Sequence, residues 1–172
     1  MAKIILLGYM GSGKSTVAKM LSQKTQIKLF DLDKIIEERA NLSITEIFKT
    51  KGEVYFRKLE HEIFKELIAS DEKSIISLGG GTPCYANNHE MLNGEGIASF
   101  YLKGSIDTLY QRLISTKENR PLIAEQSEED MKEYIAKHLF DRSFYYNQAT
   151  HKIAIDNTSI DHVVNAILEK LA

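Results

Sequence analysis

The sequence of 172 residues contains only one cysteine, two prolines and no tryptophan. A single cysteine, Cys84, cannot form an intramolecular disulfide, and no Cys and His residues stand at the spacing of metal ligands. These absences predict a reducing, cytoplasmic location. Long hydrophobic runs are also absent. No stretch approaches the roughly 18 apolar residues of a membrane span, and the apolar run at residues 4–7 is too short for a signal peptide.

An excess of charge of one sign is absent too, because 22 Lys and Arg stand against 24 Asp and Glu, for a formal net charge of −2. This balance gives no reason to expect nucleic acid, a membrane or another macromolecule as a partner, and a monomer is expected. Any anion that the protein binds must be held by a local arrangement of residues.

Hydrophobic residues make up 43% of the chain, which suits one ordinary compact domain over residues 1–172. Short apolar runs alternate with segments of helical periodicity, and this alternation predicts an α/β fold: a five-stranded parallel sheet with helices on both faces. Expected helices begin near Lys14, Ile35, Ser43, Ser105 and Ser159, and Gly52 is expected to divide the helical stretch that follows Ser43. The predicted strands are Lys3–Leu7, Ile27–Phe30, Ser74–Leu78, Ile97–Leu102 and Lys152–Ile155.

The segment Gly8–Ser15 matches the pattern G-x-x-x-x-G-K-[ST] at every defined position, between a predicted strand and a predicted helix. Its glycines let backbone N–H groups point at phosphate oxygens, and the helix N-terminus favours the same negative charge. A plain glycine-rich turn does not need Lys-Ser after its last glycine, so the segment predicts a nucleotide site. Lys14 is expected at the β- and γ-phosphates and the Ser15 hydroxyl at magnesium. The expected nucleotide contacts in the loop are Gly11, Ser12, Gly13, Lys14, Ser15 and Thr16.

Asp31 and Asp33 close the second predicted strand. Residues i and i+2 of an extended segment share a side, so both carboxylates are expected to point into the crevice beyond the strand ends. One of them can reach magnesium, directly or through water, while the other accepts a hydrogen bond from a substrate hydroxyl. The alternative is that one of the pair merely caps the next helix.

Three further features are candidates for binding an anionic substrate. Arg57 and Glu60 share a helical face at i,i+3, where the carboxylate would orient the guanidinium, although such a pair is more often a solvated surface contact. The triple glycine 79–81 follows a predicted strand and either allows close approach of a ligand or forms a plain turn. Arg142, on a short helical segment 142–146, is either a second anion clamp or a surface residue.

The polar segment 115–127 has little apolar periodicity and is predicted to be a mobile functional loop, with the lid spanning about residues 113–127. Arg112 precedes this segment and Arg120 lies within it, and an arginine on a closing lid can neutralise a transferring phosphoryl group. The histidines show no i,i+4 pairing, so surface positions or satisfied core contacts are expected for all five of them: His61, His89, His138, His151 and His162.

Taken in order, these motifs resemble the shikimate kinase family over essentially the whole chain. They are Gly-x4-Gly-Lys-Ser, Asp-x-Asp, Phe-Arg-x-x-Glu, Gly-Gly-Gly, Arg-Pro-Leu at 120–122 and Arg-x-x-x-Tyr at 142–146. The resemblance implies a P-loop NTPase fold of three α/β/α layers and transfer of the γ-phosphoryl group of ATP to the 3-hydroxyl of shikimate. That reaction depends on Mg2+ and belongs to aromatic amino-acid biosynthesis.

The resemblance also implies residue roles. Lys14, Asp33 and Arg120 would be catalytic, and a helical segment of about residues 33–61 would bind shikimate. The expected shikimate contacts are Asp33, Arg57, Gly79, Gly80, Gly81 and Arg142, with Phe48 and Phe56 beside the ring. Ser15 and, through water, Asp31 would hold Mg2+. Arg120 would contact ATP and Arg112 would lie over its adenine.

The phosphate loop is also compatible with two other functions. Another small-metabolite kinase, such as a gluconate kinase, would share the phosphate loop and lid but need not share two arginines suited to a cyclic carboxylate. A switch GTPase would require Asn-Lys-x-Asp and Asp-x-x-Gly motifs, and neither occurs in the sequence.

Overall fold

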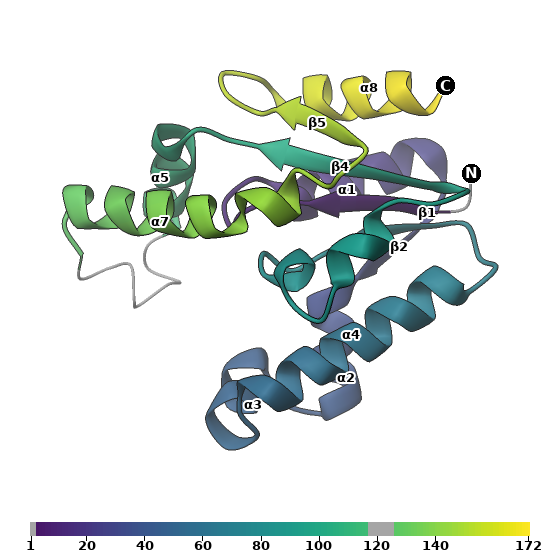
Figure 1. Ribbon diagram of the computed structural model, residues 1–172. Coiled ribbons are helices and arrows are strands. Elements are labelled where there is room, and N and C mark those ends of the chain that lie inside the picture. The colour runs from purple at the N-terminus through teal and green to yellow at the C-terminus, as the bar shows by residue number, and fades with distance from the viewer. Residues whose placement is uncertain (1–2, 117–125) are drawn as a thin grey trace.

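A computed structural model of the chain describes residues 3–116 and 126–172 (Figure 1). The strands are β1 (Lys3–Leu7), β2 (Lys28–Asp31), β3 (Ser74–Ser77), β4 (Ile97–Lys103) and β5 (His151–Ala154). They form one five-stranded sheet in the order β2-β3-β1-β4-β5, and every paired strand is parallel. The α/β fold and the five-stranded parallel sheet predicted from the sequence are therefore confirmed.

The helices flank this sheet. Helix α1 packs against α8, α5 packs against α7, and α2 and α3 pack against α4. In Figure 1, α8 runs beside β5, whereas α2, α3 and α4 form a group beyond β2. The bounds are α1 (Lys14–Thr25), α2 (Leu32–Ala40), α3 (Ile44–Thr50), α4 (Glu53–Ala69), α5 (Ile106–Ser115), α7 (Glu128–Tyr146) and α8 (Ile160–Leu171), with two short 3-10 helices, η1 (Thr82–Cys84) and η2 (Asn88–Leu92).

The core follows from the position of each strand in the sheet. All five residues of the central strand β1 and all four of β3 are buried, as expected for strands covered on both faces. At the edge, β2 has one exposed and three half-buried residues. The segments that follow β1 and β3 begin next to each other. At this point Leu6 pairs with Ser77, and the Leu78 N–H donates to the Leu6 carbonyl oxygen over 3.0 Å.

Helix starts agree with their capping residues. The side chains of Ser43, Ser105 and Ser159 each accept a hydrogen bond from the backbone N–H three residues later, as the sequence predicts. Ser127 does the same for α7. Gly52 separates α3 from α4 with φ 87°, a conformation that favours glycine.

Two expectations about elements were wrong. Helix α2 begins at Leu32, so Asp33 lies in a first helical turn and not in an extended segment. The short helical segment expected at 142–146 is the end of the 19-residue helix α7. Helix α5 continues to Ser115 and buries Leu113 in the core, so the first residues of the expected lid, from about 113, are helical. The rest of the expected lid, including Arg120, lies mainly outside the described residues.

None of the helices in the described part of the chain combines the length and the hydrophobicity of a membrane-spanning segment.

Candidate active site

The phosphate loop curls between β1 and α1, as its glycines predict. Gly11 and Gly13 have φ of 84° and 87°, a region that other residues rarely adopt. A Cβ on Gly8 would come within 2.8 Å of the Leu102 carbonyl oxygen, so the loop can lie against β4 only with glycine at this position. Lys14 Nζ donates to the carbonyl oxygens of Gly8 and Tyr9 over 2.6 and 3.1 Å. The lysine is thus folded back over the loop from which it extends.

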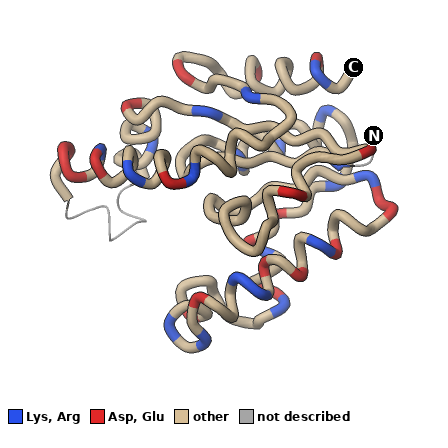
Figure 2. Tube along the Cα trace, in the orientation of Figure 1, with Lys and Arg blue, Asp and Glu red and all other residues tan. Residues whose placement is uncertain are grey.

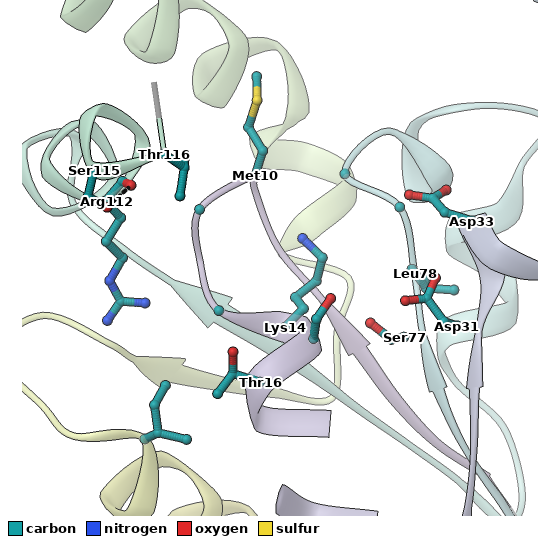
Figure 3. Close-up of a pocket in the computed structure, with 16 residues that line it drawn as sticks. Met10, Lys14, Thr16, Asp31, Asp33, Ser77, Leu78, Arg112, Ser115 and Thr116 are labelled. Atoms are coloured by element: carbon teal, nitrogen blue, oxygen red, sulfur yellow. Dashed lines mark hydrogen bonds between the residues drawn. The ribbon is translucent and has the colours of Figure 1, made fainter. Parts of the chain in front are cut away.

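A cavity of about 610 Å³ opens at the carboxyl ends of β1, β2 and β3. Asp31 and Asp33 lie on one side of it and Arg112 on the other, with Lys14 between them (Figure 3). The sequence-predicted residues that line this cavity are Gly11, Gly13, Lys14, Ser15, Thr16, Asp31, Asp33, Gly79, Gly80 and Arg112. Ser12 is buried beneath the loop, where its carbonyl oxygen accepts from Arg112 Nη1 over 3.1 Å.

The two aspartates have different local roles. Asp31 is the N-cap of α2, and its Oδ1 accepts from the Lys34 N–H over 3.2 Å. The capping alternative is therefore right for Asp31, which nevertheless also lines the cavity. Burial raises the pKa of Asp33 to about 6; Asp31 and Glu60 reinforce the rise, and Lys14 opposes it. Asp33 therefore titrates close to neutral pH, where a carboxylate can both accept and release a proton.

Each residue of the triple glycine faces a different charged side chain. A Cβ on Gly79 would lie 2.8 Å from Asp33 Oδ1, one on Gly80 3.3 Å from Arg142 Nη1, and one on Gly81 2.8 Å from Arg57 Nη2. These side chains come from α2, α7 and α4 respectively. The turn after β3 therefore brings one carboxylate and two guanidinium groups together only because it has no side chains of its own.

Arg57 is held by buried partners and is not a solvated surface residue. Its Nη1 donates to Glu60 Oε1 over 2.9 Å, and Glu60 is 1% exposed. The second oxygen of Glu60 accepts from Thr82 Oγ1 over 2.8 Å. The guanidinium also stacks on Tyr85, with Cζ 3.8 Å from the ring centroid. Pairing, stacking and burial together fix the orientation of the guanidinium.

Arg142 is held by aromatic residues. Its Nη1 donates to Tyr146 Oη over 3.4 Å, and the same hydroxyl donates to the Gly80 carbonyl oxygen. Its Cζ lies 5.6 Å from the ring centroid of Tyr9. No carboxylate within salt-bridge distance of Arg142 is found among the described residues. Its charge is therefore available for an anion.

The two phenylalanines expected beside the acceptor are in contact, with ring centroids 4.6 Å apart. Phe56 is buried, whereas Phe48 is 38% exposed. Phe48 can thus present an apolar edge beside Arg57, which follows Phe56 in α4.

Several residues at the site were not singled out from the sequence. Tyr85 and Thr82 stand shortly after the triple glycine, and their closeness to that motif is the one signal that could have identified them. Ile160, which opens α8, reaches the cavity from the far end of the sequence, and no local pattern marks it. The remaining cavity residues missed in this way are Met10, Ser77, Leu78, Ser115 and Thr116.

The charge distribution explains how a nearly neutral protein can bind anions. Acidic and basic residues are interspersed along the helices (Figure 2). At the site, Lys14 and Arg112 line the cavity together with Asp31 and Asp33. Arg57 and Arg142 add two positive charges at the glycine turn. Within the described residues, no group of three or more His, Cys, Asp or Glu could hold a metal ion alone. Carboxylate and hydroxyl oxygens beside a phosphate loop fit Mg2+, which usually takes one or two carboxylates and completes its shell with phosphates and water.

A parallel sheet has a phosphate loop after its central strand, and charged side chains from three helices meet at the glycine turn after the neighbouring strand. This is the arrangement of a P-loop kinase. The two guanidinium groups at the glycine turn, those of Arg57 and Arg142, suit a small anionic metabolite.

Comparison with known proteins identifies the family. The family model described as shikimate kinase matches residues 10–172. A shikimate kinase of Flavobacterium johnsoniae is 66% identical over 100% of both chains, and one of Flavobacterium psychrophilum is 48% identical over 97% of both. The chain belongs to the shikimate kinase family and is an ATP-dependent kinase that phosphorylates a hydroxyl of shikimate, as the sequence predicts.

Comparison with solved structures gives the same family. The shikimate kinase of Bacteroides thetaiotaomicron is similar with a TM-score of 0.89 and 33% identity, covering 99% of this chain and 98% of that one. The enzyme of Acinetobacter baumannii, solved in complex with shikimate, has a TM-score of 0.85 and 28% identity, covering 99% and 93%. A gluconokinase of Sinorhizobium meliloti has a TM-score of 0.59 at 18% identity over 99% and 93%, which shows a shared fold alone.

Proposed function

We propose that the cavity binds ATP at the phosphate loop and shikimate at the glycine turn, and that the γ-phosphoryl group passes to the 3-hydroxyl. The observation that carries this proposal is the alignment of Asp33, Arg142 and Arg57 along three consecutive glycines, one strand away from Lys14. A carboxylate that can accept from a hydroxyl and two guanidinium groups that can bind a carboxylate therefore meet at one short turn.

On the donor side, the backbone N–H groups of Gly11–Thr16 receive the phosphates, and Lys14 turns from its carbonyl partners to the β- and γ-phosphates. Ser15 and, through water, Asp31 would hold Mg2+, which when bound neutralises charge on the β- and γ-phosphate oxygens. Arg112, which donates a hydrogen bond to the loop at Ser12, would cover the adenine. The assignment of Arg120 to ATP stays a prediction from the sequence.

On the acceptor side, Arg57 and Arg142 bind the carboxylate of shikimate, and Gly79–Gly81 let the ring approach the backbone. Phe48 contributes an apolar contact beside Arg57. Asp33 accepts a hydrogen bond from the 3-hydroxyl. Because phosphoryl transfer has a loose transition state, Asp33 orients the hydroxyl first and receives its proton late, at a carboxylate whose pKa of about 6 suits that exchange.

Steady-state kinetics with both substrates varied separates these roles. Arg57→Ala removes a charge-assisted contact to shikimate, so the KM for shikimate should rise by about tenfold or more while the KM for ATP stays within twofold. Asp33→Asn should lower kcat by about 10²- to 10⁴-fold. Arg39→Ala is the matched control, because Arg39 pairs with Glu66 at the surface, away from the cavity.

Equal effects of Arg57→Ala and Arg39→Ala on the shikimate KM would refute the carboxylate assignment. NMR of the product tests the site of transfer, since phosphorylation at another hydroxyl would contradict the proposed orientation at Asp33.

A further inference from the structure

Tyr9, within the phosphate loop, makes a contact that the proposed function leaves unused. Its side chain is 1% exposed, and its Oη lies 2.8 Å from Nδ1 of His138 in the middle of α7. The two residues are 129 positions apart in the sequence, so this hydrogen bond joins the nucleotide-binding loop to a distant helix. Tyr134 packs edge-on against the imidazole, with ring centroids 4.3 Å apart.

The same two residues border Arg142. His138 precedes Arg142 by four positions, one turn of α7, so both side chains lie on one face of the helix. The Tyr9 ring lies within cation–π distance of the Arg142 guanidinium, at 5.6 Å from Cζ to the centroid. Tyr146 binds the guanidinium from the next turn. Arg142 is thus placed by neighbours that are themselves fixed by hydrogen bonds.

We propose that Tyr9 and His138 are paired positioning residues that hold Arg142 beside the phosphate loop for the carboxylate of shikimate. This inference rests on the role proposed above for Arg142. An arginine side chain loses rotamer entropy when it binds an anion, and a neighbour that restricts it beforehand lowers that cost. Because Tyr9 belongs to the phosphate loop, the pair also fixes the acceptor's anion grip relative to the ATP site.

Nδ1 of a neutral His138 imidazole can accept from the Tyr9 hydroxyl or donate to it, and the protonated ring can only donate. Partial burial and the charges of Arg142 and Lys137 hold the pKa of His138 below its ordinary value of 6.5, against the opposing effect of Asp141. On the loop side, the titratable group that faces His138 is the Tyr9 hydroxyl. Protonation at acidic pH would place a second positive charge one turn from Arg142. The added charge would repel Arg142 but would also attract an anion, so the pair is tested at pH 7.5, above the lowered pKa of His138.

The first test is Tyr9→Phe, which keeps the ring beneath Arg142 and removes only the hydroxyl. Loss of one hydrogen bond should raise the shikimate KM by about 3- to 10-fold, with a smaller change in the KM for ATP. His138→Leu should have a similar effect. If the two variants act through their mutual bond, the double variant should be no worse than the more affected single variant.

The second test is His138→Asn, which keeps a polar atom near the position of Nδ1 but does not titrate. At pH 7.5 it should restore the shikimate KM to near the wild-type value.

Phe140→Ala is the matched control on α7, since Phe140 is 84% exposed and lies outside the site, so it should leave both KM values unchanged. Arg142→Ala separates the two proposals. If Arg142→Ala raises the shikimate KM but Tyr9→Phe and His138→Leu do not, the positioning role is wrong and the proposed function stands. If Arg142→Ala leaves that KM unchanged, the carboxylate assignment fails, and with it the inference. Additive effects in the double variant would overturn the pair.

Discussion

Gly81→Ala should weaken shikimate binding without harming the fold. Gly81 has φ −95° and ψ −9°, a conformation that alanine adopts without strain. The added methyl group would lie 2.8 and 3.0 Å from Nη2 and Nη1 of Arg57, closer than carbon approaches nitrogen in real structures. The backbone can stay in place, so the guanidinium must move. The substitution therefore acts on one functional group.

The size of the effect follows from what holds Arg57. To reach ordinary contact at 3.4 Å or more, the guanidinium must shift by several tenths of an ångström against its bond to Glu60 and its stacking on Tyr85. A shift of that size disrupts a two-point bond to a carboxylate. A hydrogen bond to a charged group contributes about 1.5–3 kcal/mol, so the shikimate KM should rise about 10- to 150-fold. The free energy of unfolding should change by less than about 1 kcal/mol, since alanine also restricts the unfolded chain.

The assay is coupled ADP release, with shikimate varied at saturating ATP and then ATP varied at saturating shikimate. Gly80→Ala is the internal comparison: its methyl group would meet Arg142 Nη1 at 3.3 Å, so its effect on the shikimate KM should be smaller. A shikimate KM for Gly81→Ala within twofold of wild type would refute the reasoning. So would an equal rise in the KM for ATP.

Three further predictions concern stability and reactivity. Because burial raises the pKa of Asp33 to about 6, its ionised form destabilises the fold above that pH, and the penalty is lost as the pH falls below about 4. Asp33→Asn should therefore increase the urea-unfolding free energy by on the order of 1–2 kcal/mol at pH 7.5 and not at pH 4. Phe48→Ala, at a 38% exposed position, should raise the shikimate KM a few-fold with a small stability loss, whereas Phe56→Ala should cost about 3–5 kcal/mol in the same unfolding titration. Burial raises the pKa of the Cys84 thiol to about 11 against the effect of Arg142, so iodoacetamide should modify it slowly at pH 7.5, and more slowly still in Arg142→Ala, as mass spectrometry would show.

The sequence predicts the parts of the fold whose signals are local. The phosphate loop, the serine caps and the break at Gly52 each depend on a few adjacent residues, and all are confirmed. Helix α7 was predicted too short because its buried residues are sparse and Phe140 and Phe144 are exposed, so no apolar stripe follows the helical period. Asp33 was wrongly expected in an extended segment, because helix α2 begins at Leu32, immediately after β2. No glycine or proline separates the strand from the helix to mark this boundary in the sequence.

The sequence indicates which charged residues are candidates for the site. It does not indicate which neighbouring side chains hold them. The pairing of Arg57 with Glu60 follows from i,i+3 spacing, but its burial depends on Thr82 and Tyr85, which come from a different element. Contacts between distant segments, such as that of Tyr9 with His138, leave no periodic trace in either segment. Sequence reasoning therefore indicated which groups carry charge, and the structure adds what keeps each group in place.

The pairing of β1 with β3 limits which features of such an enzyme can change by substitution of side chains. The two turns that we propose bind donor and acceptor leave from strands joined by backbone hydrogen bonds, including that from the Leu78 N–H to the Leu6 carbonyl oxygen. Neighbouring strands lie about 4.8 Å apart whatever their side chains, so the spacing between the two turns does not depend on residue identity. The acceptor's charges, in contrast, arrive on α2, α4 and α7. Substitutions on these helices can alter which molecule is phosphorylated while the distance over which the phosphoryl group travels is inherited unchanged.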